Sequence, residues 1–215
     1  MSVRMGILGS GTVARTLGSG YLDVGHEVIL GSRDPSKLAD WVEQAGLKAR
    51  VGTFSEAAHS SEILILAVKG TAAEEALSLA GPENLRDKVI LDATNPIADI
   101  PPKDGVLSFF TGPEESLMNR LQKHYPGGRF VKAFNSVGAG RMVQPDFQGI
   151  KPTMFICGDD EDARKIVSGL VQELGWEVCD MGSSAASRSV EALCILWCIP
   201  GFRENSWNHA LKLLR

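Results

Sequence analysis

The feature that most constrains the fold is a glycine-containing turn near the N-terminus. An apolar segment over residues 4–8 runs directly into Gly9-Ser10-Gly11, and Ala14 completes a Gly-x-Gly-x-x-Ala pattern. In a strand–turn–helix unit, the first glycine permits a tight bend and the second lets a ligand approach the backbone. The small third residue lets the helix pack against the strand. Because the N-terminus of the next helix suits a pyrophosphate, the turn predicts a dinucleotide site.

The residues after the second predicted strand indicate which dinucleotide would bind. A site for NAD carries Asp or Glu about twenty residues after the turn, whereas this chain has Ser32-Arg33. A hydroxyl and a guanidinium suit a 2′-phosphate, so this pair favours NADP over NAD. Two alternatives stay open, because the turn can be purely structural and Arg33 can be a solvated loop charge. Asp34 lies before a proline and is interpreted as a helix N-cap, not as a ribose ligand.

The composition of the 215-residue chain is that of an ordinary globular protein, with 44% hydrophobic and 22% charged residues. The formal net charge of −4 gives no basic surface, so nucleic acid is not expected as a partner. No apolar run approaches the ~20 residues that span a bilayer, so no membrane partner is expected. Because the first predicted strand begins almost at Met1, no signal peptide is expected, and the predicted location is cytoplasmic.

Strands alternate with helices over most of the chain. Continuous apolar runs at 63–68, 89–92 and 130–134 are typical of central parallel strands buried on both faces. The alternation implies right-handed crossovers. It predicts the α/β class, a Rossmann-type doubly wound parallel sheet with a small C-terminal α/β extension. We expect the main section over residues 1–135 and the smaller one over 136–215.

Several helix boundaries are indicated by capping and helix-breaking residues. The Thr-x-x-Glu patterns at 53–56 and 71–74 predict capping boxes at two helix starts. A helix is expected over 35–45. In the smaller section, a strongly apolar helix over 186–199 is expected to stop at a Pro-Gly pair, and a last helix is expected over 204–214.

The cysteines and histidines form no recognisable metal or catalytic pattern. Cys194 and Cys198 lie four residues apart in an apolar run and are predicted to be buried thiols on one helical face. His26 begins the second predicted strand and is expected at the surface, His209 is expected on the last helix, and the other two histidines end predicted helices. No bound metal and no catalytic acid or base is predicted.

Further segments along the chain are characteristic of one family. They are Gly9-Ser10-Gly11-Thr12-Val13-Ala14, Gly25-His26-Glu27-Val28, Gly31-Ser32-Arg33-Asp34-Pro35, Asp92-Ala93-Thr94-Asn95-Pro96, Val131-Lys132-Ala133-Phe134-Asn135 and Phe155-Ile156-Cys157-Gly158-Asp159-Asp160. With these segments the chain resembles the NADPH-dependent reductases of the coenzyme F420 type. More distantly, it is similar to the reductase domain of the STEAP metalloreductases. The Gly-Ser-Arg and Lys-Ala-Phe-Asn segments are more specific than the glycine turn, which many reductases share.

The resemblance implies roles for particular residues. Thr12 and Val13 would lie beside the pyrophosphate, while Ser32 and Arg33, with Lys37, would hold the 2′-phosphate. The residues implied near the ribose, the nicotinamide and the second ligand are Val68, Lys69, Asn95, Pro96, Ala133, Phe134 and Asn135. With the turn residues Gly9, Ser10 and Gly11 they form the predicted cofactor site. The C-terminal section would complete the crevice for the nicotinamide and the second ligand.

The resemblance also implies an activity. It is that of an NADP-dependent oxidoreductase that transfers hydride between NADP(H) and a small-molecule acceptor, coenzyme F420 (a deazaflavin) or a flavin. It further favours a homodimer. A non-catalytic NADPH-binding redox sensor is the alternative.

A hydroxyacid dehydrogenase is the less favoured assignment. Lys132 and Asn135 match residue types used by β-hydroxyacid dehydrogenases, but there they would lie on a helix in a large helical second domain. Here the two residues bracket the end of a predicted strand, and only about eighty residues follow.

Overall fold

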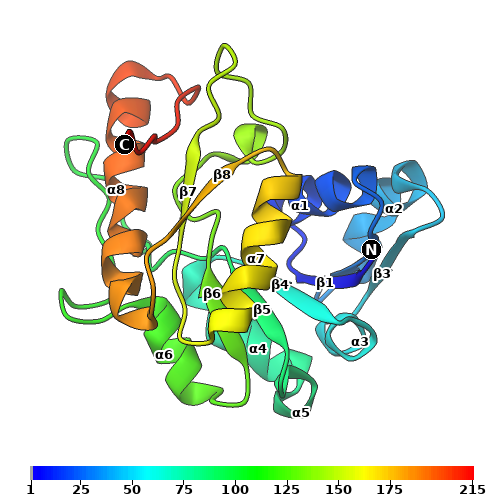
Figure 1. Ribbon diagram of the computed structural model, residues 1–215. Helices are drawn as coiled ribbons and strands as arrows, with labels where there is room; N and C mark the ends of the chain where they lie inside the picture. Colours follow the sequence, from blue (N-terminus) through cyan, green and yellow to red (C-terminus); the bar gives the residue numbers. More distant parts are fainter. Residues whose placement is uncertain (1) are drawn as a thin grey trace.

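Six parallel strands form the central sheet of the computed structural model, which describes residues 2–215 (Figure 1). The strands are β1 (Arg4–Leu8), β2 (Glu27–Gly31), β3 (Ala49–Gly52), β4 (Ile63–Leu66), β5 (Val89–Asp92) and β6 (Arg129–Lys132). Their order is β3-β2-β1-β4-β5-β6, so the chain reverses its direction of winding between β1 and β4. Ligands bind outside the carboxyl ends of the strands at such a point. The predicted doubly wound α/β fold is confirmed.

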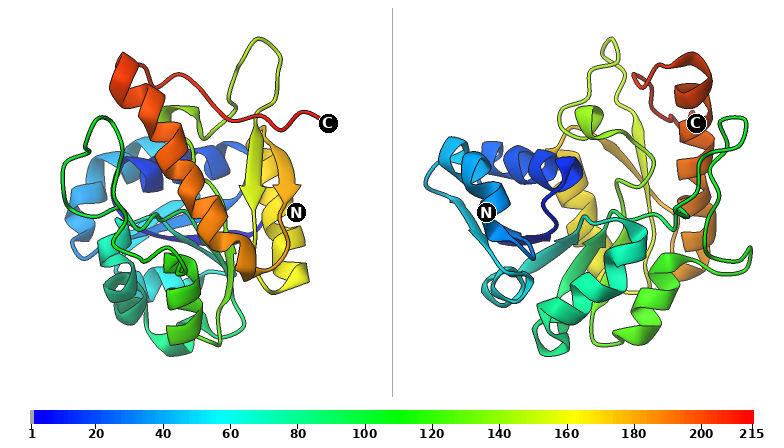
Figure 2. Two further views of the ribbon diagram at one scale, coloured as in Figure 1. Left: turned by 90° about the vertical axis from the view of Figure 1, so that its left-hand side faces the viewer. Right: turned by 180° about the vertical axis from the view of Figure 1, so that it is seen from behind.

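Helices cover both faces of this sheet (Figures 1 and 2). One face carries α1 (Thr12–Asp23), α2 (Ala39–Ala45) and α7 (Glu161–Glu173), whose apolar side chains share one core cluster. The opposite face carries α3 (Phe54–Ser60), α4 (Ala73–Ala80), α5 (Pro82–Leu85) and α6 (Leu117–His124). Short 3-10 turns are η1 (Pro35–Leu38), η2 (Gly70–Ala72), η3 (Ala139–Arg141) and η4 (Ser184–Ala186).

The apolar runs become central strands because their side chains supply both faces. In β4, Ile63 and Ile65 pack into the core with α1 and α7, whereas Leu64 packs with α3 and α4 on the other side. The same division separates Leu91 from Ile90 in β5. Side chains alternate across a strand, so a strand buried on both faces needs an unbroken apolar sequence.

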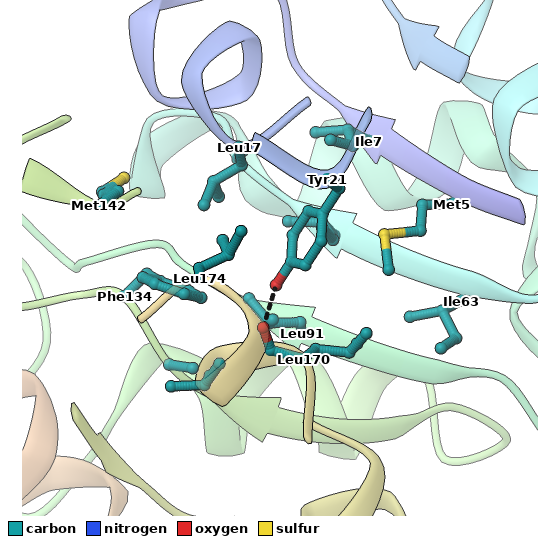
Figure 3. Close-up of a cluster of buried hydrophobic side chains, with 14 of the residues drawn as sticks. Met5, Ile7, Leu17, Tyr21, Ile63, Leu91, Phe134, Met142, Leu170 and Leu174 are labelled. Carbon is teal, nitrogen blue, oxygen red and sulfur yellow. Dashed lines mark hydrogen bonds between the residues drawn. The ribbon is translucent and has the colours of Figure 1, made fainter. Parts of the chain in front are cut away.

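Tyr21 of α1 lies near the centre of the core cluster that α1, α2 and α7 share (Figure 3). Its hydroxyl donates to the carbonyl of Leu170 in α7 at 3.4 Å, and burial raises the pKa of Tyr21 far above its usual value. Met5 and Leu174 contribute to the same cluster. The section after residue 135 therefore supplies part of the core that covers the sheet.

The C-terminal section is built from a parallel pair, β7 (Thr153–Ile156) and β8 (Glu177–Asp180), together with α7 and α8 (Ser187–Glu204). The predicted stop before Pro200 and the predicted helix over 204–214 are both wrong. Pro200 lies inside α8, which ends at Asn205 in the left-handed conformation. The remaining residues run as an extended segment beside β7, and the N–H of Thr153 donates to the carbonyl of Leu211 (Figure 2).

The reason for this different ending lies in the aromatic packing at Gly201. A β-carbon on Gly201 would collide with the ring of Trp207, so the chain folds back tightly over the end of α8. His209 is therefore not helical, and its ring stacks on Trp197 with 5.0 Å between the centroids. These contacts bury Trp197 and override the local helix preference of the last residues.

Local capping is partly as predicted. Thr53 and Glu56 form the expected capping box, and Asp34 accepts from the N–H of Ser36 at 3.2 Å. The helix expected over 35–45 is divided into η1 and α2. The second capping box, at 71–74, is wrong because α4 begins through η2 and has no side-chain cap.

The surface position expected for His26 is also wrong. The residue is 3% exposed, its Nδ1 accepts from the N–H of Val3 at 3.1 Å, and its Nε2 lies 2.7 Å from a carboxylate oxygen of Glu173. The docking of α7 onto this face covers the ring, which no local sequence pattern reveals.

Among the helices of residues 2–215, none combines the length and the apolar character of a membrane-spanning segment.

Gly6 in β1 should tolerate no side chain, because a β-carbon there would lie 2.5 Å from the carbonyl oxygen of Ala57 in α3. We expect Gly6→Ala to destabilise the fold by about 1–3 kcal/mol through overpacking. Gly169→Ala is the matched control, because a β-carbon at that position in α7 meets nothing within 4 Å and helix propensity favours alanine. Urea unfolding measures both variants, and equal midpoints would contradict the close packing of α3 on β1.

Candidate functional site

A cleft of about 280 Å³ opens at the carboxyl ends of β1, β2 and β4. We call it the first cleft. Its lining residues are Gly9, Ser10, Gly11, Ser32, Arg33, Phe54, Ala67, Val68, Lys69, Ala72, Glu75 and Ala76. The glycine turn and the Ser-Arg pair, which are separate in sequence, therefore lie in one cavity.

The two glycines of the turn serve different purposes. Gly9 has a φ of +146°, its N–H donates to the carbonyl of Gly31 at 3.0 Å, and a β-carbon on it would collide with the carbonyl oxygen of Ala67. Gly11 has an ordinary φ of −79°, and a β-carbon there would meet nothing within 4 Å. Protein packing therefore explains Gly9 but not Gly11, whose missing side chain leaves space beside the helix start.

The N-terminus of α1 faces this space without a side-chain cap. The first N–H groups of a helix need partners, and the positive dipole end favours an anion. Thr12 and Val13 begin the helix at this point. The turn thus offers both the room and the donors that a pyrophosphate requires.

Arg15 braces the glycine turn from outside, a role that the motif does not indicate. Its Nε donates to the carbonyl of Ser10 at 3.1 Å, and its Nη2 donates to the carbonyl of Lys37 at 2.7 Å. It thereby ties the turn to the connection that follows β2. The sequence signal available for this role was a cation directly after the motif.

The end of β2 presents a hydroxyl and a cation to the first cleft. Ser32 is buried and accepts from the N–H of Asp34 at 3.1 Å, whereas the guanidinium of Arg33 is largely exposed. The Asp34 carboxylate is engaged by Ser36, whose hydrogen bond holds the pKa of Asp34 below its usual range. Lys37 lies 3.7 Å from the same carboxylate and is not among the lining residues.

A second cleft of about 270 Å³ adjoins the first and shares Val68 and Lys69 with it. Its other lining residues are Gly70, Thr71, Ala93, Thr94, Asn95, Ile97 and Asp99. The ammonium of Lys69 lies 3.7 Å from the carboxylate of Asp99, and both side chains are well exposed. The two clefts together form a crevice along the carboxyl edge of the sheet from β2 to β5.

The wall of the second cleft is fixed by two asparagines. The side-chain amide of Asn95 donates to the carbonyl of Asn135 at 2.7 Å, and the amide of Asn135 donates to the carbonyl of Val190 in α8 at 2.8 Å. Phe134 between these segments has a φ of +58°, which is rare for a bulky residue. Such strain persists only where surrounding contacts impose it, and it clusters at ligand sites.

Behind this wall lies a fully buried ionic cluster, which we call the Lys132 cluster. The ammonium of Lys132 lies 2.6 Å from Asp92 and 2.9 Å from Glu191, and it donates to the carbonyl of Thr94 at 2.8 Å. Burial alone would lower the pKa of Lys132, but the two carboxylates reverse this and raise it. The ammonium thus lies within 2.9 Å of three protein oxygens, so Lys132 is not arranged to exchange a proton with a ligand.

The excess negative charge of the Lys132 cluster is balanced by a helix. The two oxygens of Glu191 accept from the N–H groups of Leu117 and Met118, at 2.9 Å and 3.0 Å, at the N-terminus of α6. Asp92 accepts from the N–H of Thr94 at 2.9 Å. The cluster thus joins α6 and α8 to the ends of β5 and β6, directly behind the second cleft.

The predicted site residues fall into two groups. Those that line the clefts are Gly9, Ser10, Gly11, Ser32, Arg33, Val68, Lys69 and Asn95. Those that do not are Thr12, Val13, Lys37, Pro96, Ala133, Phe134 and Asn135. Ala133 and Asn135 are buried, and the first group brings together residues from four separate segments of the sheet edge.

The thiols take no part in this crevice. All four cysteines are buried, as predicted for Cys194 and Cys198, and burial raises the pKa of Cys157 to about 12. Within residues 2–215, no group of three or more His, Cys, Asp or Glu side chains is arranged to hold a metal ion.

Comparison with known proteins agrees with this geometry. Residues 4–96 match the family model described as NADP oxidoreductase, coenzyme F420-dependent. A crystal structure from Arthrobacter sp. FB24, described provisionally as an F420-dependent NADP-reductase, superimposes with a TM-score of 0.92 over 100% of both chains at 29% identity. The F420-dependent NADP reductase of Methanothermobacter thermautotrophicus is 24% identical over 95% of this chain and 91% of its own length.

The chain also matches part of a larger protein. It is 31% identical to rat Metalloreductase STEAP3 over 88% of this chain, but it spans only 36% of that relative's length. The resemblance predicted from the sequence motifs is thereby confirmed. These matches support an NADP-dependent oxidoreductase.

Removing the cation of the Lys132 cluster should be severely destabilising. Lys132→Met leaves Asp92 and Glu191 buried without their partner, and we expect a loss of about 3–5 kcal/mol in the free energy of unfolding. Lys165→Met is the control, because that residue forms only exposed ion pairs on α7 and should change stability by less than about 0.5 kcal/mol. Similar unfolding midpoints for the two variants would contradict the stabilising role of the cluster.

Proposed function

From the family match of residues 4–96, we propose that this chain transfers hydride between NADP(H), bound along the two clefts, and a flat redox acceptor. The observation that carries the proposal is the composition of the first cleft. It combines an uncapped helix N-terminus beside Gly11 with Ser32 and Arg33 at the end of β2, where an NAD site would place a carboxylate.

The residues of the crevice fit the parts of this cofactor in order. The pyrophosphate would take the N–H groups at the start of α1 beside Gly11, and the 2′-phosphate would take Ser32 and Arg33. The nicotinamide end would then reach Val68 and Asn95 in the second cleft. The neighbouring or supporting residues of the same site would be Thr12, Val13, Lys37, Pro96, Ala133 and Asn135.

The chain's own residues would act by binding and orientation. NADPH, when bound, supplies the hydride chemistry, and hydride transfer between two flat rings needs little acid–base assistance. The charged groups that line the second cleft, Lys69 and Asp99, face each other. The rigid wall formed by Asn95 and Asn135 would hold the ring at a fixed distance from the acceptor, which is how positioning accelerates such a step.

For the acceptor, we propose a deazaflavin of the coenzyme F420 class or a flavin. Support comes from the relative in M. thermautotrophicus, which is named an F420-dependent NADP reductase and has nearly the same length. The STEAP metalloreductases support a reductase in general. Because this chain covers 36% of the rat protein, metal reduction is not carried over.

Turnover with a panel of acceptors tests the proposal. Protein and NADPH are mixed with coenzyme F420, FMN, FAD or a quinone, and the loss of absorbance of the reduced nicotinamide is followed. We expect oxidation of NADPH with the deazaflavin or a flavin. Tight NADPH binding without turnover on any acceptor would contradict hydride transfer and favour a non-catalytic NADPH sensor.

Gly11 should separate cofactor binding from folding. Since a β-carbon there meets no protein atom within 4 Å, Gly11→Ala should leave the urea midpoint unchanged. The methyl group would occupy space proposed for the pyrophosphate, and we expect NADPH affinity to fall by about tenfold or more, which is about 1.4 kcal/mol. Gly112→Ala, whose β-carbon also meets nothing, is the control. Undiminished NADPH binding by Gly11→Ala would place the pyrophosphate elsewhere.

A further inference from the structure

A carboxylate on α4 faces the end of β2 across the first cleft. Glu75 lies in the first turn of α4 and is one of the cleft's lining residues. Its two carboxylate oxygens lie 3.4 Å and 3.5 Å from Nη1 of Arg33. The acid that an NAD site would carry on β2 is absent, but an acid from another element reaches the cation that replaces it.

This contact has little value for the fold. Both side chains are more than half exposed, and such ion pairs contribute only about 0.2–1 kcal/mol. An acidic residue in the first turn also favours the dipole of α4, but Glu74 in the same turn has that property equally. What distinguishes Glu75 from Glu74 is its place in the cleft beside Arg33.

We propose that Glu75 is the counter-ion of Arg33 in the ligand-free cleft and a specificity-determining residue for the cofactor. This inference rests on the proposed function, which puts the 2′-phosphate on Arg33. A phosphate monoester carries a charge of about −1.5 to −2 and can bind a guanidinium through two parallel hydrogen bonds. It therefore displaces the carboxylate and leaves Glu75 beside a like charge.

The consequence is selective. NADPH must break the Arg33–Glu75 pair and then experiences the repulsion of the Glu75 carboxylate. NADH has no 2′-phosphate and leaves the pair intact. Glu75 thus weakens the binding of the phosphorylated cofactor only, which moderates the preference set by Arg33 and favours release of the spent cofactor.

Calorimetric titration of Glu75→Gln with NADPH and with NADH tests this role. We expect NADPH to bind about two- to fivefold more tightly than to the wild-type chain, with NADH unchanged. Glu74→Gln removes the same charge one residue away and should leave both affinities unchanged. Because the ion pair is exposed, the gain should shrink as salt is raised from low to high concentration.

Several outcomes would overturn the inference. Equal NADPH affinity for Glu75→Gln and wild type would remove Glu75 from cofactor selection. Weaker binding of both cofactors would show that the carboxylate contacts their shared adenosine. Either result, together with a wild-type preference for NADPH, would leave the proposed function standing. A wild-type chain that binds neither cofactor would overturn the proposed function and this inference together.

Discussion

The crevice depends on how closely the backbone passes at Gly9. The N–H of Gly9 donates to the carbonyl of Gly31, which ends β2, and a β-carbon on Gly9 would collide with the carbonyl oxygen of Ala67, just after β4. The chain is thus held between two strands that are distant in sequence. Only glycine fits this position. The close passage aims the start of α1 at the point where the strand order reverses, and the first cleft with its Ser32 and Arg33 wall opens there.

The other half of the crevice depends on charges that the apolar interior encloses. The Lys132 cluster holds Thr94 from behind, and the pairing of Asn95 with Asn135 ties the same segment to α8. The C-terminal section therefore does not merely follow the sheet. Its helix α8 fixes the wall against which a nicotinamide would lie, while α7 completes the core around Tyr21 on the face beneath α1.

Much of this architecture could be predicted from local sequence because parallel strands and glycine turns have local causes. The apolar segments at 4–8, 63–68, 89–92 and 130–134 became β1, β4, β5 and β6, and the turn located α1. Features that depend on distant contacts were missed: the burial of His26 under α7, the continuation of α8 through Pro200, and the placement of Glu75 opposite Arg33. One signal was available for the Lys132 cluster, since charged residues inside apolar segments need buried partners.

The central claim is that Arg33 binds the 2′-phosphate of NADP(H) at the end of β2. Calorimetry of the wild-type chain and of Arg33→Asp, each with NADPH and NADH, measures this directly. A charge-assisted hydrogen bond contributes about 1.5–3 kcal/mol, or roughly one to two orders of magnitude in affinity. We expect the substitution to weaken NADPH binding by that factor and to leave NADH binding unchanged. Equal losses for both cofactors, or a wild-type preference for NADH, would contradict it.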